Sequence, residues 1–143
     1  MLLEPMSTRL RNPHLHIKNI LKEYDLEKII DARVLNVGLA ATNIIIRTKK
    51  NKYIMKIFGS ANYKKYFLEV SARNFACEKG IPTSCAYKNS KGELITKYNG
   101  CYVTIFEFIE GKKMRYGKNM DKYMFSIGKI LGNMDTIYAK FFF

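Results

Sequence analysis

The sequence predicts an α+β fold, in which one main helix packs on a five-stranded antiparallel sheet. Segments rich in β-branched and aromatic residues alternate with turns of Gly, Asn and Lys, as in strands joined by short connections. Residues 63–79 instead repeat apolar side chains at helical spacing. With 143 residues, 48% of them hydrophobic, the chain has the size and apolar content of one domain with its own core.

The first residues carry little periodic signal. Residues 1–16 contain two prolines and are expected to form a loose leader. His14 and His16 have the spacing of a metal-binding pair on a strand, but no nearby Cys, Asp or Glu completes a ligand set, so solvated side chains are favoured. A short helix is expected over 17–24, because apolar residues recur there at helical spacing: Ile17, Ile20, Leu21 and Tyr24.

Three strands are expected next as an antiparallel meander, over 29–37, 44–48 and 53–58. In the third strand side chains alternate between two faces, and Lys56 shares its face with Ile54 and Phe58. A buried ammonium is costly unless it meets an anion. The strand pattern leaves three environments open for Lys56: a carboxylate of another element, the phosphates of a nucleotide under the small-residue turn 38–42, or water reached from an edge strand.

The main helix is expected over 63–79, ended by Gly80 at its C-cap position and by Pro82 just beyond. Glu69 lies beside the apolar side of this helix. Taken alone, its carboxylate is typical of a surface residue that pairs with a Lys or Arg four positions away.

A hairpin and a very apolar strand are expected to follow, over 86–97 and 101–109. Glu110-Gly111 ends the apolar strand abruptly, and a further helix is expected over 121–138. An apolar strand that leads through Glu-Gly toward a helix is where a hinge between two lobes would lie.

The cysteines and the chain ends bear on environment and partners. Cys77, Cys85 and Cys101 are odd in number and lack Cys-x-x-Cys spacing, which argues against a disulfide framework or zinc site and favours a reducing cytoplasm. No run approaches the roughly eighteen apolar residues of a membrane span, so no membrane partner is expected. Three aromatic rings at the end predict self-association through an exposed apolar patch: Phe141, Phe142 and Phe143.

The net charge is +13, from 25 Lys and Arg against 12 Asp and Glu. Such an excess attracts polyanions, and the many aromatic residues could stack on bases. However, the basic residues are scattered from Arg9 to Lys140, and most aromatic residues fall at core-facing positions. A nucleic-acid-binding module is therefore a minor alternative, and the favoured explanation of the charge is a biased genome composition, which would enrich the chain in Lys, Ile, Asn and Tyr.

The order of these features resembles the N-terminal lobe of the aminoglycoside phosphotransferase, homoserine kinase and choline kinase superfamily, a branch of the protein-kinase-like fold. Tyr53-Ile-Met-Lys56 is similar to the family's third strand with its phosphate-binding lysine, and Glu69 takes the place of the helix carboxylate that pairs with it. Other segments resemble the nucleotide-covering turn, the helix exit, the hairpin turn and the hinge, at 38–43, 79–82, 91–93 and 102–111. Ser84 departs from the family, which usually has a proline there.

The resemblance implies roles in binding ATP phosphates. Lys56, held by Glu69, would bind the α- and β-phosphates. Gly38 would let the backbone approach the phosphates without a Cβ in the way, and Thr42 would offer its hydroxyl.

The resemblance also implies an adenine slot. Adenine would lie against apolar side chains that include Phe106, and it would exchange hydrogen bonds with the backbone carbonyl of Glu107 and the backbone N–H of Ile109. Because these two contacts come from the backbone, the side chains at 107 and 109 carry little information.

Catalytic residues are the part of the family pattern that the sequence lacks. Members take the substrate proton with an Asp in a His-Gly-Asp or similar loop of a C-terminal lobe, and hold Mg²⁺ with a further Asp. None of the aspartates here follows a histidine: Asp25, Asp31, Asp121 and Asp135. No catalytic or metal-binding residue is therefore assigned, and this chain alone is expected to be inactive.

The resulting expectation has three parts: a leader over 1–16, a kinase-like lobe over 17–109, and a hinge exit with the first helix of a truncated C-terminal lobe over 110–143. The lobe would bind ATP, and a full-length form would use Mg²⁺ to transfer the γ-phosphate to a hydroxyl of a small molecule. The main alternative is a non-catalytic interaction or scaffold protein built on the same lobe.

Overall fold

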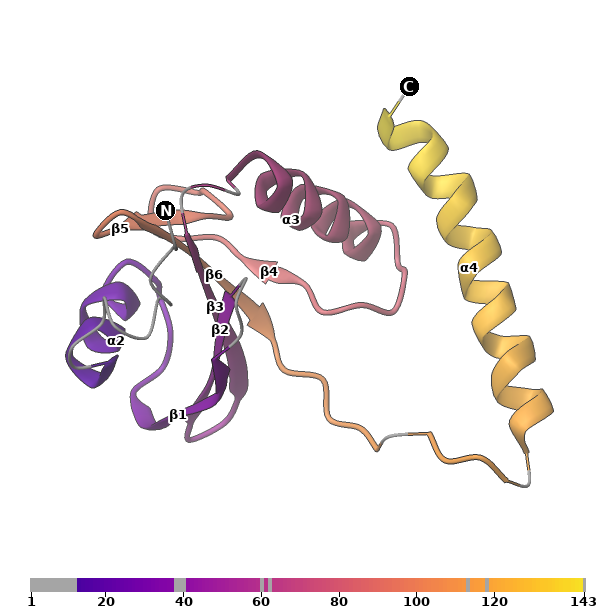
Figure 1. Cartoon of the computed structure of the whole chain (residues 1–143), viewed down its shortest axis with the longest axis horizontal. Helices are drawn as coiled ribbons and strands as arrows, with labels where there is room; N and C mark the ends of the chain where they lie inside the picture. Colours follow the sequence, from indigo (N-terminus) through magenta and orange to yellow (C-terminus); the bar gives the residue numbers. More distant parts are fainter. Residues whose placement is uncertain are drawn as a thin grey trace.

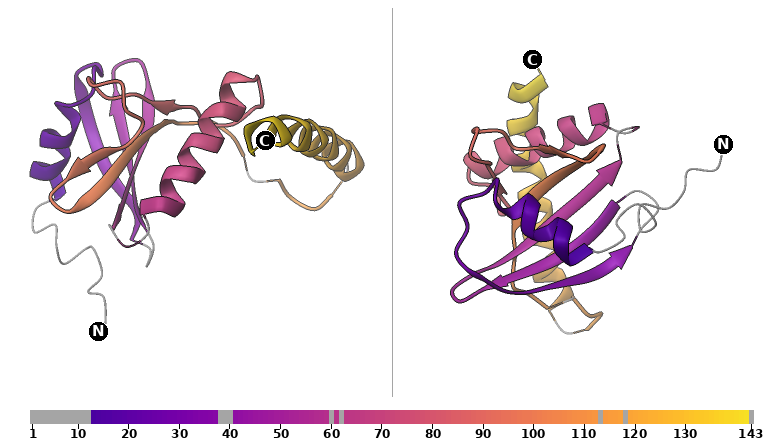
Figure 2. Two further views of the ribbon diagram at one scale, coloured as in Figure 1. Left: turned by 90° about the horizontal axis from the view of Figure 1, so that it is seen from above. Right: turned by 90° about the vertical axis from the view of Figure 1, so that its left-hand side faces the viewer.

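The computed structural model describes residues 13–37, 41–59, 61, 63–112, 114–117 and 119–142. One antiparallel sheet lies between helix α2 (Pro13–Leu21) and helix α3 (Tyr63–Glu78), as the left view of Figure 2 shows. A third helix, α4 (Met120–Phe142), lies beside α3 on the side away from the sheet (Figure 1). The predicted α+β class with an antiparallel sheet and one main helix packed on it is confirmed.

The strands follow the predicted meander and then fold back onto it. They are β1 (Ile29–Val37), β2 (Ala41–Thr48), β3 (Lys52–Gly59), β4 (Ala86–Tyr87), β5 (Thr96–Tyr98) and β6 (Cys101–Glu107). Their order is β1-β2-β3-β6-β4, with β5 also paired to β6. The strand β1 forms an edge, and its register with β2 shifts between Ile29 and Asp31 and again between Val34 and Asn36. Strand β3 is internal, between β2 and β6.

The sheet has six strands where five were expected. Of the hairpin predicted over 86–97, the turn at 89–92 is present, but the pairing of its two arms is wrong. Among the described strands, β4 and β5 both pair with β6 and not with each other. The connection between them is braced by Asn89, whose side-chain oxygen accepts from the backbone N–H groups of Lys91 at 3.0 Å and Glu93 at 2.9 Å. Asn89 also donates to the Thr96 hydroxyl at 3.0 Å. Backbone bonds close the same turn, since the N–H of Gly92 donates to the carbonyl of Asn89 at 2.9 Å and the N–H of Asn89 donates to the carbonyl of Glu93 at 2.8 Å.

The first helix lies earlier than expected. It begins at Pro13, a residue suited to the first turn of a helix, and ends at Leu21. Residues 13–16, expected in the leader, are therefore helical, and residues 1–12 lie outside the described part. Nδ1 of His16 lies 3.1 Å from the Tyr98 hydroxyl of β5, so this side chain is not the solvated one expected. His14 lies among the residues whose side chains are not described.

The two faces of the sheet have different neighbours. One face packs on α2 and on the turn after it, through Ile17, Ile20, Leu21, Tyr24, Ile44, Ile46, Tyr53, Met55, Ile57, Cys101, Val103 and Ile105. The other face meets α3, where the rings of Phe58 and Tyr66 lie 4.0 Å apart between centroids. Because side chains alternate along β3, Lys56 shares the α3 face with Phe58.

Helix α4 is longer than the 121–138 expected. Its last part packs on α3, whereas earlier residues are exposed. The Phe141 ring lies 5.0 Å from the Phe75 ring of α3. Earlier in the helix, Met124 and Leu131 are 56% and 54% exposed. Phe143 and the Phe142 side chain lie outside the described part. None of the helices in the described ranges has the length and apolar character needed to cross a bilayer.

Cys77 and Cys85 form a disulfide, although the odd number and the spacing of the cysteines argued against a disulfide framework. Gly80 ends the helix in the left-handed region with φ +81°, and the N–H of Ile81 donates to the carbonyl of Ala76 at 3.0 Å. This turn returns the chain along the end of α3, so that the two Cα atoms lie 5.6 Å apart. Sequence spacing alone could not show that reversal. Cys101 remains a free, buried thiol.

Reduction of this disulfide should lower the free energy of unfolding by about 2–3 kcal/mol, because the bond closes a short loop in the unfolded chain. The measurement is urea denaturation of the oxidised protein and of the C77S/C85S double variant. A Cys101→Ala variant is the control for loss of a cysteine. It keeps the disulfide, so reductant should lower its free energy of unfolding by the same amount as that of the wild type. Equal stability of oxidised wild type and double variant would contradict the prediction.

Candidate functional site

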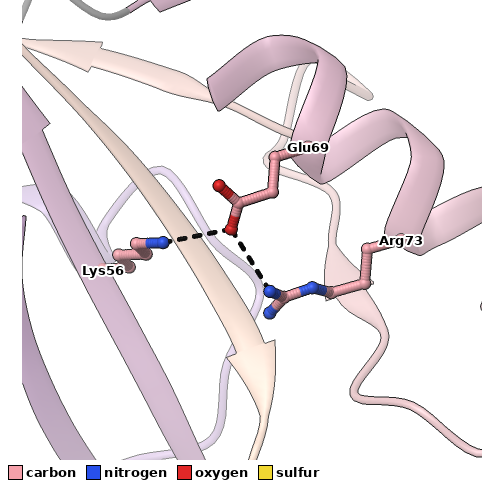
Figure 3. Close-up of polar contacts among 3 residues, drawn as sticks. All are labelled: Lys56, Glu69 and Arg73. Carbon is pink, nitrogen blue, oxygen red and sulfur yellow. Dashed lines mark hydrogen bonds and ion pairs between the residues drawn. The ribbon is translucent and has the colours of Figure 1, made fainter. Parts of the chain in front are cut away.

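Lys56 lies at the centre of the sheet and faces helix α3. In register it pairs with Asn43 of β2 and Thr104 of β6, so the edge-strand environment considered for it is wrong. Its Nζ lies 3.2 Å from Oε1 of Glu69, and the lysine side chain is only 21% exposed (Figure 3). The anion that meets Lys56 within the chain is therefore a carboxylate of the main helix.

Glu69 has two cationic partners on one oxygen. Besides Lys56, the guanidinium of Arg73 lies 3.3 Å from the same Oε1, one helical turn further along α3 (Figure 3). Two partners were considered for Glu69: a basic residue four positions away and the lysine of the third strand. The structure has both, Arg73 on the same helix and Lys56 on the sheet.

Each of the two cations lies against one aromatic ring. The Nζ of Lys56 lies 4.9 Å from the centroid of the Tyr66 ring, and the guanidinium carbon of Arg73 lies 4.6 Å from that of Phe106. Burial raises the pKa of Tyr66, and the nearby Glu69 carboxylate adds to the rise. The tyrosine therefore stays neutral at physiological pH.

The end of β6 is held by backbone bonds on both sides. The N–H of Glu107 donates to the carbonyl of Cys85 at 2.9 Å, and the N–H of Phe108 donates to the carbonyl of Lys52 at 3.3 Å. Lys52 and Glu110 form an ion pair beyond it. Phe106 is buried, whereas Ile109, whose N–H was assigned to adenine, is exposed.

The structure does not bring every predicted residue to Lys56. Thr42 pairs with Ile57 in register, and Ile57 belongs to the face that packs on α2. The Thr42 side chain is only 6% exposed and lies on the opposite face of the sheet from Lys56. Gly38 lies outside the described residues.

Three residues of this site were not found from the sequence. Arg73 had only its i+4 spacing from Glu69 as a signal, and Tyr66 had its position one turn before it. Thr104 lies opposite Lys56 in register, is fully buried, and has a hydroxyl with no hydrogen-bond partner among the residues the structure describes. No signal in the sequence indicated Thr104, because only the strand register places it.

A cavity of about 260 Å³ opens beside the end of β6. It is lined by Lys50, Asn51, Lys52, Tyr87, Glu107, Phe108 and Glu110. Within the described ranges, no three His, Cys, Asp or Glu side chains gather where they could hold a metal ion.

The chain is similar in sequence to homoserine kinases. It is 27% identical over 123 residues to the homoserine kinases of Methylobacillus flagellatus and Methylobacillus glycogenes, and the match covers 85% of this chain. The chain spans 37% of the length of these curated relatives. No protein-family model matches it.

Solved structures share the fold at low sequence identity. A spectinomycin phosphotransferase in complex with ADP and spectinomycin superposes with a TM-score of 0.66 at 14% identity, covering 80% of this chain and 35% of that one. An amicoumacin kinase in complex with AMP-PNP, Ca²⁺ and Ami superposes with a TM-score of 0.63 at 14% identity, covering 80% and 36%. The predicted resemblance to a kinase-like N-terminal lobe is confirmed.

The Lys56–Glu69 pair should contribute about 1 kcal/mol to stability, because both side chains are partly shielded from water. A double-mutant cycle with Lys56→Met and Glu69→Gln, followed by urea denaturation, measures this coupling energy. The matched control is the cycle for Asp31 and Arg47, a 3.7 Å pair whose side chains are more than half exposed. The control coupling should be near zero, and an equal coupling in both cycles would contradict the expectation.

Proposed function

Because the chain has the fold of the N-terminal lobe of kinase-like phosphotransferases, we propose that it is an ATP-binding lobe of a small-molecule phosphotransferase. The observation that carries the proposal is the ion pair of Lys56 with Glu69 between a central strand and the main helix. A cation in this half-buried position needs an anion. A helix carboxylate holds it in place until phosphate oxygens are available.

The phosphate end of the nucleotide is assigned to Lys56. Its ammonium attracts the α- and β-phosphates, and Glu69 fixes the direction in which the side chain extends. Gly38 keeps its expected role of letting the backbone approach the phosphates. The Thr42 hydroxyl is left out of the proposed site, because its strand position directs it to the other face.

The adenine end is assigned to the α3 face beside the end of β6. Ile54 lies opposite Phe106 in register on this face. Phe106 is buried and lies under the Arg73 guanidinium, so it supports this face from within, and Ile54 offers the apolar surface to the base. The carbonyl of Glu107 and the N–H of Ile109 remain the proposed backbone partners of adenine. The bonds that the neighbouring N–H groups make to Cys85 and Lys52 hold this backbone in one conformation.

Transfer of a phosphoryl group is proposed for a longer protein and not for this chain alone. A full-length form would transfer the γ-phosphate of ATP to a hydroxyl of a small molecule. The chain lacks the His-Gly-Asp type of loop that would supply the base, so these 143 residues are proposed to be inactive by themselves. Mg²⁺ would supply charge neutralisation at the phosphates in that longer form.

Helix α4 has a separate role in the proposal. Its exposed apolar residues, which include Met124 and Leu131, are suited to pack against further elements of a C-terminal lobe. Self-association through the terminal rings is retained as a proposal for Phe142 and Phe143, while Phe141 contacts Phe75 within the chain.

A cytoplasmic location also remains proposed. The cysteine count no longer supports it, because Cys77 and Cys85 are bonded, and the proposal now rests on the need for ATP.

Isothermal titration calorimetry of the 143-residue chain with ATP and with adenosine tests the assignment. Lys56→Ala should weaken ATP binding about tenfold and leave adenosine binding within about twofold, because the lysine contacts only phosphates. An exposed lysine near β4 gives the matched control, and Lys88→Ala should change neither affinity by more than about twofold.

Failure of this experiment separates the alternatives. Absence of ATP binding by the wild type would favour the scaffold protein. Retention on a polyanion column that disappears at modest salt, without a preference for adenine nucleotides, would favour the nucleic-acid module. Incubation of the wild type with ATP and Mg²⁺ should release no ADP above a blank, and turnover would refute the proposed inactivity.

A further inference from the structure

The cluster of Lys56, Glu69 and Arg73 carries one excess positive charge. Both cations lie on the same carboxylate oxygen, at 3.2 Å and 3.3 Å, which is longer than the roughly 2.8 Å of a strong charged hydrogen bond. One carboxylate is thus divided between two cations and binds neither at full strength. The three side chains are 21%, 36% and 33% exposed, so water screens their charges only in part.

Arg73 is the fixed member of this cluster. Its guanidinium lies over the Phe106 ring of β6 while it pairs with Glu69 on its own helix, so it is held from two sides. An arginine keeps its charge at all physiological pH values. Lys56 touches Glu69 from the facing strand and its Nζ lies 4.9 Å from the Tyr66 ring, so it too has two partners (Figure 3). Its compact ammonium carries three donors on a flexible four-carbon stem, whereas the planar guanidinium of Arg73 is fixed by its position over a ring, so the lysine can redirect its charge at lower cost.

Departure of Lys56 would normally leave a partly buried carboxylate without a partner, which is strongly unfavourable. Arg73 removes that penalty, because it still neutralises Glu69 after the lysine turns away. It also weakens the hold of Glu69 on Lys56 beforehand. Both effects make the ammonium more available to an incoming polyphosphate.

We propose that Arg73 is a positioning residue for polyphosphate binding: it acts through Glu69 and leaves Lys56 free to exchange its carboxylate partner for phosphate oxygens. This inference rests on the proposed nucleotide-binding function and adds to it a residue outside the Lys56–Glu69 pair. Arg73 does not contact the nucleotide. Its effect is confined to the phosphate end and depends on the Glu69 carboxylate.

The test measures dissociation constants of ATP, adenosine and inorganic tripolyphosphate for the 143-residue chain by calorimetry. Arg73→Gln should weaken ATP and tripolyphosphate about fivefold and change adenosine less than about twofold. Arg73→Lys keeps a charge next to Glu69 but loses the planar group over Phe106, so its ATP affinity should lie between those of wild type and Arg73→Gln. Lys64→Gln removes one charge from an exposed position of the same helix and should alter ATP binding less than about twofold.

A fourth measurement distinguishes action through Glu69 from direct contact. In the E69Q background, Arg73→Gln should change ATP affinity less than about twofold, because the shared carboxylate is gone. A full fivefold effect in that background would overturn the proposal, as would an equal loss for adenosine or an equal effect of Lys64→Gln.

The two proposals can fail separately. ATP binding by the wild type with no response to Arg73→Gln refutes only the role of Arg73. Tripolyphosphate binding that depends on Arg73, without any ATP binding, refutes the nucleotide assignment and supports the role of Arg73. Binding of neither ligand refutes both.

Discussion

The ion pair between Lys56 and Glu69 is the constraint around which the lobe is arranged. An ammonium on an internal strand is unfavourable unless the fold supplies an anion, and α3 supplies one across a 3.2 Å contact. The helix must therefore lie where Glu69 can reach Lys56. The packing of Tyr66 on Phe58 fixes that position from one side, and the disulfide at Cys77 fixes the end of the helix.

Much of this arrangement follows from local patterns. Period-two alternation placed Lys56 on one face with Ile54 and Phe58, and helical spacing with a Gly80 stop placed the main helix. The identity of the partner anion did not follow, because a strand pattern contains no information on what lies opposite. Resemblance to a family supplied Glu69. The alternation of β2 also assigns Thr42 to the face of the buried Ile44 and Ile46, against the role expected for its hydroxyl.

What escaped prediction depends on contacts between distant segments. Thr104 lies beside Lys56 only because β6 inserts next to β3, although about forty residues separate those strands in sequence. The pairing of β4 with β6 has the same origin. The pairing of β5 with β6 is local instead, because Asn99 and Gly100 join the two strands in a two-residue turn with positive φ at both positions, a hairpin signal that the sequence does carry. The bond between Cys77 and Cys85 required knowledge of how the chain reverses after α3, which a count of cysteines cannot give.

The outer strand β1 has a consequence for solubility. Among the described residues no strand pairs with its outer edge, and Ile30, Val34 and Leu35 are exposed beside it, which together resemble a template for pairing with another chain. Two register shifts bend this strand, and the charged side chains of Asp31 and Arg33 interrupt its apolar surface. We expect an irregular, charged border of this kind to align poorly with a flat second strand, which disfavours association between molecules at β1.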